Sequence, residues 1–138
     1  MKTTFIVPGL PRGKERPRVT RYGAAYTPKK TADYERAVAW KYRAENGGRT
    51  FTGPVRVRIT ALFPVPKSAK RVLKDKIAAG EVVPYPHRPD ADNIAKIILD
   101  ALNGVAWHDD GAVTELEVHK YYGVLIGTVV TISGEEEG

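Results

Sequence analysis

Apolar residues recur at every second position in the middle of the chain. Between Val55 and Phe63 they alternate with Arg56, Arg58 and Thr60, and prolines follow. A period of two predicts a strand with one buried face. Strands are also predicted over residues 3–7, 113–122 and 124–132, the last two turning at Gly123. Residues 22–27 are predicted to be an extended segment.

Three other stretches have the spacing of helices. The clearest follows a pair of aspartates, and its apolar positions are Ile94, Ile97, Ile98, Ala101 and Leu102. These fall at i, i+3, i+4, i+7 and i+8, and Asn103-Gly104 ends the helix. A second helix is predicted from Pro28 to Gly47-Gly48, and a short amphipathic one over residues 70–79.

The order of these elements predicts one α+β domain over residues 1–134, in which helices pack on a mixed sheet. The final residues, 135–138, are predicted to be a disordered acidic tail. With 138 residues, 42% of them apolar, the chain can bury one core. It has no cysteine, which excludes thiolate metal sites and thiol nucleophiles.

Basic and acidic residues are separated along the chain. Residues 1–89 hold 20 Lys and Arg against 6 Asp and Glu, whereas residues 90–138 hold 2 against 10. This pattern fits either a solvated surface or a polyanion-binding platform joined to an acidic site. No apolar run approaches the ~20 residues that cross a bilayer, and no secretory signal is recognisable, so we expect a soluble cytoplasmic protein.

The basic residues are densest near the N-terminus. The segment from Gly9 to Arg21 contains two prolines and no apolar period, so it is expected to be an exposed loop. Its cations are candidates for gripping phosphates: Arg12, Lys14, Arg16, Arg18 and Arg21.

The candidate chemistry lies around the helix that begins near Ile94. Asp90 and Asp92 precede it two residues apart, where they either cap the helix or hold a metal ion. Asp109-Asp110 follows the helix and either adds carboxylates to that site or forms a turn.

Lys96 lies four residues after Asp92 and four before Asp100. It either joins an i, i+4 ion-pair ladder or supplies an ammonium to phosphodiester hydrolysis. The three histidines are too scattered for a zinc site, and no phosphate-binding glycine motif occurs, so a nucleotide cofactor is not expected.

Taken together, these residues resemble the signature of the RusA family of Holliday junction resolvases. The resemblance rests on R-P-D-A-D-N-I-A-K-I-I-L-D-A-L-N-G from Arg88 to Gly104 and W-H-D-D from Trp107 to Asp110. Further similarity, to phage and prophage members, lies in Gly9, Pro11, Lys14, Arg16-Pro17-Arg18, Tyr26-Thr27-Pro28 and Tyr34-Glu35.

The resemblance implies a homodimeric endonuclease with a RusA-like fold that resolves four-way junctions by paired nicks. It makes Asp90, Asp92 and Asp110 metal ligands, with Asp109 as an additional candidate. Lys96 becomes the catalytic lysine, and the cofactor is Mg²⁺, with Mn²⁺ as a substitute. Ala112 stands where the family commonly has Gln, so any contact of that amide is missing.

Other functions compete with this one. A non-catalytic DNA-binding module would explain the basic half of the chain and treat the aspartates as caps. A metal nuclease acting on flaps or other branched DNA would share the chemistry and differ in substrate. An RNA-binding protein is less well supported, because no aromatic-rich sheet motif occurs.

Overall fold

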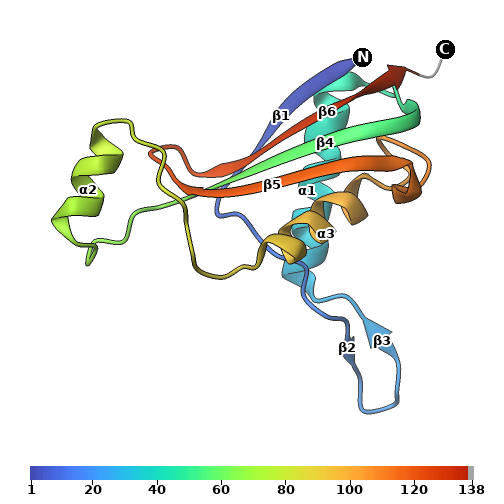
Figure 1. Cartoon of the computed structure of the whole chain (residues 1–138). Helices are drawn as coiled ribbons and strands as arrows, with labels where there is room; N and C mark the ends of the chain where they lie inside the picture. Colours follow the sequence, from blue (N-terminus) through green and yellow to red (C-terminus); the bar gives the residue numbers. More distant parts are fainter. Residues whose placement is uncertain (137–138) are drawn as a thin grey trace.

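The computed structural model describes residues 1–136 and contains one mixed four-stranded sheet (Figure 1). Its strand order is β1-β6-β4-β5. The strands are β1 (Lys2–Pro8), β4 (Phe51–Phe63), β5 (Val113–Tyr122) and β6 (Gly127–Glu136). The helices α1 (Lys29–Asn46) and α3 (Ala91–Leu102) cover one face. This is the α+β architecture that the sequence predicted.

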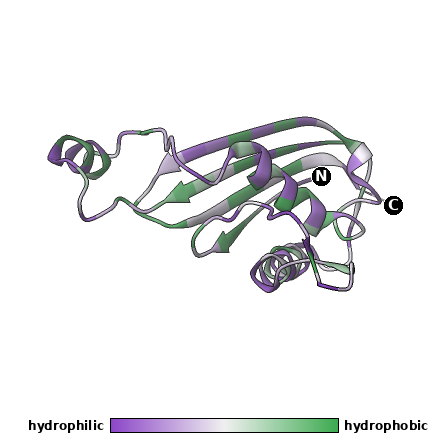
Figure 2. Cartoon of the chain, turned by 90° about the horizontal axis from the view of Figure 1, so that it is seen from below, coloured by the Kyte–Doolittle hydropathy of each residue, from purple (hydrophilic) through white to green (hydrophobic). Residues whose placement is uncertain are grey.

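The core lies between the sheet and these two helices. On β4 the predicted alternation is observed, since Val55, Val57 and Ile59 are buried and the residues between them are not. The predicted stripe of α3 is also buried, including Ile94 and Ile97. Burying each such side chain contributes about 1.5–3 kcal/mol. Figure 2 shows the resulting alternation of hydrophobic and hydrophilic bands along the strands and helices.

The order of the last two strands differs from a simple hairpin. β6 pairs antiparallel with both β1 and β4, whereas β5 pairs parallel with β4 on its other side. The chain leaves β5, turns at Gly123, whose amide donates to the carbonyl of Phe63 (2.9 Å), and crosses the end of β4. Residues 124–126 are therefore an exposed loop, and the strand predicted from Val124 begins at Gly127.

The end of the chain is more ordered than predicted. Glu135 and Glu136 extend β6 and pair with Thr52 and Phe51 of β4. The prediction of a disordered tail is therefore wrong for these two residues, because the long strand β4 continues beside them. The rest of that predicted tail, 137–138, lies outside the described residues.

The parallel β4–β5 pair requires a long crossover. The segment between them contains α2 (Arg71–Ala78), which lies beyond the end of the sheet, and α3 on its face (Figure 1). Between β1 and α1, a short hairpin of β2 (Arg18–Val19) and β3 (Ala25–Tyr26) projects from the body. No helix within residues 1–136 is long and apolar enough to cross a membrane.

Candidate active site

Two exposed carboxylates lie at the N-terminus of α3. Asp90 occupies the N-cap position, yet its side chain makes no capping hydrogen bond. Asp92 lies in the first turn, and its Oδ1 accepts a hydrogen bond from the amide of Asn93 (3.0 Å). No ion pair of either carboxylate occurs in residues 1–136. Capping therefore does not explain Asp90, and both groups have oxygen atoms free to bind a ligand.

Lys96 is exposed one turn further along the same helix. The alternative of an i, i+4 ladder is not observed, because Asp100 pairs with Lys14 and no ion pair of Lys96 occurs in the described part of the chain. Lys96 instead lines a hollow of about 500 Å³ between α3 and the basic loop, together with Arg16 and Asn93. Its ammonium is therefore available to a molecule that enters this hollow.

The basic loop is docked against the N-terminal turn of α3. The amide of Lys14 donates to the carbonyl of Asn93 (2.8 Å). At Gly13, a Cβ atom would lie 2.9 Å from Cβ of Pro89 and 3.1 Å from Cβ of Asn93, so the close approach requires glycine. The loop therefore lies beside the segment that carries Asp90 and Asp92.

A three-residue charge cluster strengthens this docking. Lys14 Nζ lies 3.0 Å from Oε1 of Glu35 on α1 and 3.1 Å from Oδ2 of Asp100 on α3. Burial by itself lowers the pKa of Lys14, but hydrogen bonds and attraction to the two carboxylates outweigh it and raise the net pKa above 10.5. Lys14 was predicted to grip phosphate. Here its ammonium is engaged by two carboxylates, which makes it an anchor of the loop.

The other cations of this segment differ in exposure. Arg16, Arg18 and Arg21 are placed toward solvent, and Arg18 has a long contact with Glu15 (3.5 Å). Arg12 is half-buried, and its charge partly offsets the burial that raises the pKa of Tyr34. Arg16, Arg18 and Arg21 are therefore the exposed arginines of this segment.

Asp109 and Asp110 lie near the C-terminal end of α3, away from Asp90. Asp110 begins a short 3₁₀ turn, η1 (Asp110–Ala112), which leads directly into β5. Ala112 shares a hollow with Gly104, which follows the last turn of α3.

The N-terminal end of α3 lies at the other end of β5. There Lys120 Nζ donates a hydrogen bond (2.8 Å) to the carbonyl of Pro89, the residue before Asp90. From Val113 to Lys120 the strand rises about 23 Å, and the twelve residues of α3 span about 18 Å.

The predicted convergence of Asp90, Asp92 and Asp110 is therefore not observed within one chain. Among residues 1–136 there is no group of three or more His, Asp or Glu side chains that could hold a metal ion. The physical reason is the straight helix between them, which separates residues that flank it in sequence.

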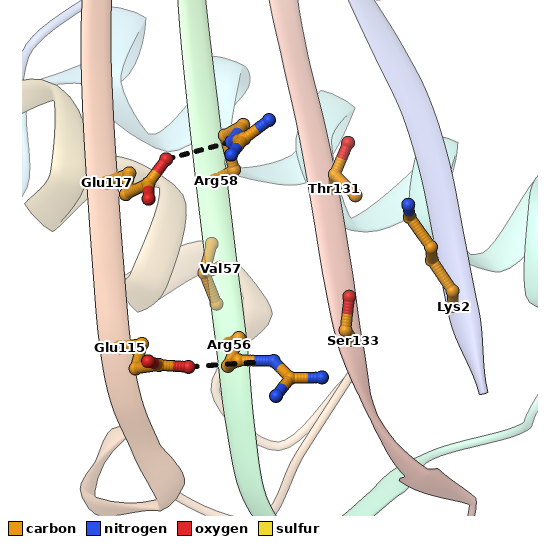
Figure 3. A pocket seen from close by; sticks show the side chains of 8 residues that line it. All are labelled: Lys2, Arg56, Val57, Arg58, Glu115, Glu117, Thr131 and Ser133. Atoms are coloured by element: carbon orange, nitrogen blue, oxygen red, sulfur yellow. Dashed lines mark hydrogen bonds and ion pairs between the residues drawn. The ribbon is translucent and has the colours of Figure 1, made fainter.

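The open face of the sheet carries a second charged surface, shown in Figure 3. There Arg58 donates to Glu117 (2.9 Å), and Arg56 lies 3.6 Å from Glu115. The hydrogen bond from Arg58 and a further one from His119 lower the pKa of Glu117. These charges pair across neighbouring strands on the face opposite α3. This charged surface is therefore distinct from the candidate site.

Comparison with known proteins agrees with the motif around α3. The endodeoxyribonuclease RusA family matches residues 8–133. The chain belongs to the RusA family. It is also similar to the uncharacterized protein YqaN of Bacillus subtilis (strain 168), with 34% identity over 122 residues that cover 86% of each chain.

Membership of the RusA family assigns the chain to a class of enzymes. RusA-family proteins are endodeoxyribonucleases that act on branched DNA junctions and are generally dependent on divalent metal ions. The matched region contains the basic loop and both ends of α3. The fold predicted from the motif is thereby confirmed.

Proposed function

We propose that the chain is a Mg²⁺-dependent endonuclease that resolves four-way DNA junctions by paired nicks during recombination or repair. The observation that carries this proposal is the pair of exposed carboxylates, Asp90 and Asp92, beside a docked arginine-rich loop. A site that cuts a polyanion needs both a place for a hard cation and cations that hold neighbouring phosphates.

The donor set at the start of α3 suits Mg²⁺, with Mn²⁺ as a substitute. Asp90 and Asp92 offer hard carboxylate oxygens, and Mg²⁺ is usually held by one or two carboxylates together with water and phosphate oxygens. Mg²⁺ bound there would supply Lewis-acid chemistry for phosphodiester hydrolysis. Lys96, four residues after Asp92 on the same helix, orients the attacking water or stabilises charge that develops on the phosphate.

A homodimer explains how Asp110, and Asp109 beside it, join this site. When two copies pack with their α3 helices antiparallel about a two-fold axis, the C-terminal end of one helix meets the N-terminal end of the other. Asp110 of one copy then lies near Asp90 and Asp92 of the second, and two equivalent sites form. A four-way junction presents two-fold related strands, which suits paired cuts.

The outward-facing arginines hold the DNA through its phosphates. Replacing Arg16 and Arg18 by Gln is expected to lower junction affinity. It should also reduce the slope of log affinity against log salt by about 0.9 for each phosphate that the protein no longer neutralises. Fluorescence titrations without divalent metal at several salt concentrations measure this slope. Arg36→Gln on α1 is the matched control, and an unchanged slope in the double variant would contradict the assignment.

A substrate comparison tests the whole proposal. Nicking of a mobile four-way junction, a flap and a linear duplex is measured at one salt concentration with Mg²⁺, with Mn²⁺ and with EDTA. We expect paired nicks in the junction with either metal, at least about tenfold slower cutting of the other substrates, and none with EDTA. Faster cutting of the flap would indicate a different branched-DNA nuclease, and binding without metal-dependent cutting would indicate a non-catalytic module.

A further inference from the structure

The projecting hairpin has a turn that is held together by its own hydrogen bonds. The amide of Thr20 donates to the carbonyl of Ala24 (2.8 Å), and the amide of Gly23 donates to the carbonyl of Thr20 (3.0 Å). Thr20 Oγ1 also accepts hydrogen bonds from the amides of Tyr22 (3.3 Å) and Ala24 (3.1 Å). None of these bonds uses the side chain of Tyr22, so the turn does not depend on it.

The turn presents an aromatic ring to solvent. Tyr22 is 88% exposed, and its hydroxyl makes no hydrogen bond within residues 1–136. Its one ring contact in this region is with the guanidinium of Arg21, 5.8 Å from the ring centroid. Arg18 adds a second exposed cation at the base of the hairpin. A ring this exposed does not stabilise the core, but it offers a flat apolar face next to positive charge.

Both ends of the hairpin are attached close to the candidate active site. Its first strand begins four residues after Lys14, whose ammonium is held by Glu35 and Asp100 and whose amide is bonded to Asn93. The other strand leads into α1, which begins at Lys29. The hairpin is thus attached at both ends to the two helices that carry the anchor.

We propose that Tyr22 stacks on an unpaired nucleobase of branched DNA while Arg18 and Arg21 contact the flanking phosphates. This inference rests on the proposed function, because a four-way junction would supply the unpaired base at the point where its strands exchange. Aromatic rings bind bases of any sequence, because every base has a π face, and arginines beside them add cation–π and phosphate contacts. The positive charge around the ring favours a polyanion such as DNA as the partner of this surface.

The test compares DNA that has an unpaired base with DNA that lacks one. Binding of wild type, Tyr22→Ala and Tyr22→Phe is titrated in EDTA against a duplex with one unpaired 2-aminopurine and against a fully paired duplex. We expect wild type and Tyr22→Phe to prefer the unpaired base and to quench its fluorescence by stacking. Tyr22→Ala should bind the DNA with the unpaired base about fivefold or more weakly than wild type, and it should not quench the fluorescence. Its affinity for the fully paired duplex should change little.

Two controls make the result specific. Trp40→Ala removes another exposed aromatic residue that lies beside a lysine but belongs to α1, and it should behave as wild type. Unfolding curves of Tyr22→Ala should match wild type, since the turn keeps its hydrogen bonds. Thr20→Val, which removes the acceptor at Oγ1, should weaken binding to the unpaired base in the same direction.

The outcomes separate this inference from the proposed function. Equal preference and quenching for wild type and Tyr22→Ala would overturn the stacking site, even if the protein nicks junctions with Mg²⁺. An equal reduction in Trp40→Ala would also overturn it. A Tyr22-dependent preference in a protein that cuts no DNA would support the stacking site and reject the resolvase proposal.

Discussion

Replacing Asp90 by Asn is expected to lower the rate of Mg²⁺-supported junction nicking about 100-fold or more, and Asp110→Asn should do the same. Each change keeps the size of the side chain but removes a negative oxygen from the proposed metal site, where groups that stabilise developing charge are worth about 10²–10³ in rate. Both residues are exposed and make no ion pair within residues 1–136, so folding should not change. Single-turnover nicking measures the rate, and titration in EDTA checks that junction binding persists.

Mixing the two inactive variants tests whether each site is shared between copies. In a mixed dimer of Asp90→Asn and Asp110→Asn chains, a shared arrangement leaves one site with both carboxylates intact and the other with neither. Nicking of one strand should therefore reappear in the mixture. Light scattering should give a mass of about 30 kDa, twice the 15.2 kDa of one chain. A mixture that stays inactive while dimers exchange would contradict the shared site.

Replacing Lys14 by Met is expected to loosen the basic loop and to destabilise the fold by about 1–2 kcal/mol. The change leaves the carboxylates of Glu35 and Asp100 close together without the ammonium between them. A fully buried pair would be destabilised more, but these side chains are 15–31% exposed, so solvent screening reduces the effect. Urea unfolding measures the stability. The rate of trypsin cleavage after Arg18 measures how often the loop opens, and this rate should be higher in Lys14→Met.

The control and the pH dependence identify the cause. Lys70→Met removes a lysine that makes no ion pair in the described region and should leave both measurements unchanged. Adding Glu35→Gln and Asp100→Asn to Lys14→Met should recover part of the stability. Because the folded pKa of Lys14 lies above 10.5, its contribution is fully present below pH 10.5 and is lost as the pH rises through the folded pKa. If the difference in unfolding free energy between wild type and Lys14→Met persisted at a pH above the folded pKa of Lys14, it would argue against the ion pairs.

The local elements and the family were accessible from sequence. Alternation along β4 and the stripe of α3 are short-range patterns, because a strand repeats every two residues and a helix every 3.6. The motif around Asp90, Asp92 and Lys96 also identified the family before any fold was known. The role of Lys14 was less accessible. Its partner Glu35 is 21 residues away on α1, and nothing in the local pattern shows that the Glu35 side chain turns toward the loop.

The relative positions of strands and side chains that are far apart in the sequence were decided by tertiary packing. Strand alternation specifies which face of β6 is buried, but it does not specify that β6 inserts between β1 and β4. Asp100 lies one turn from Lys96, yet it pairs with Lys14, because packing the loop on α3 brings that ammonium within 3.1 Å. Most importantly, the sequence places Asp90 and Asp110 on either side of a helix without stating how far apart they lie. The helix is rigid, so folding holds them at its opposite ends, and only the proposed homodimer would bring them together.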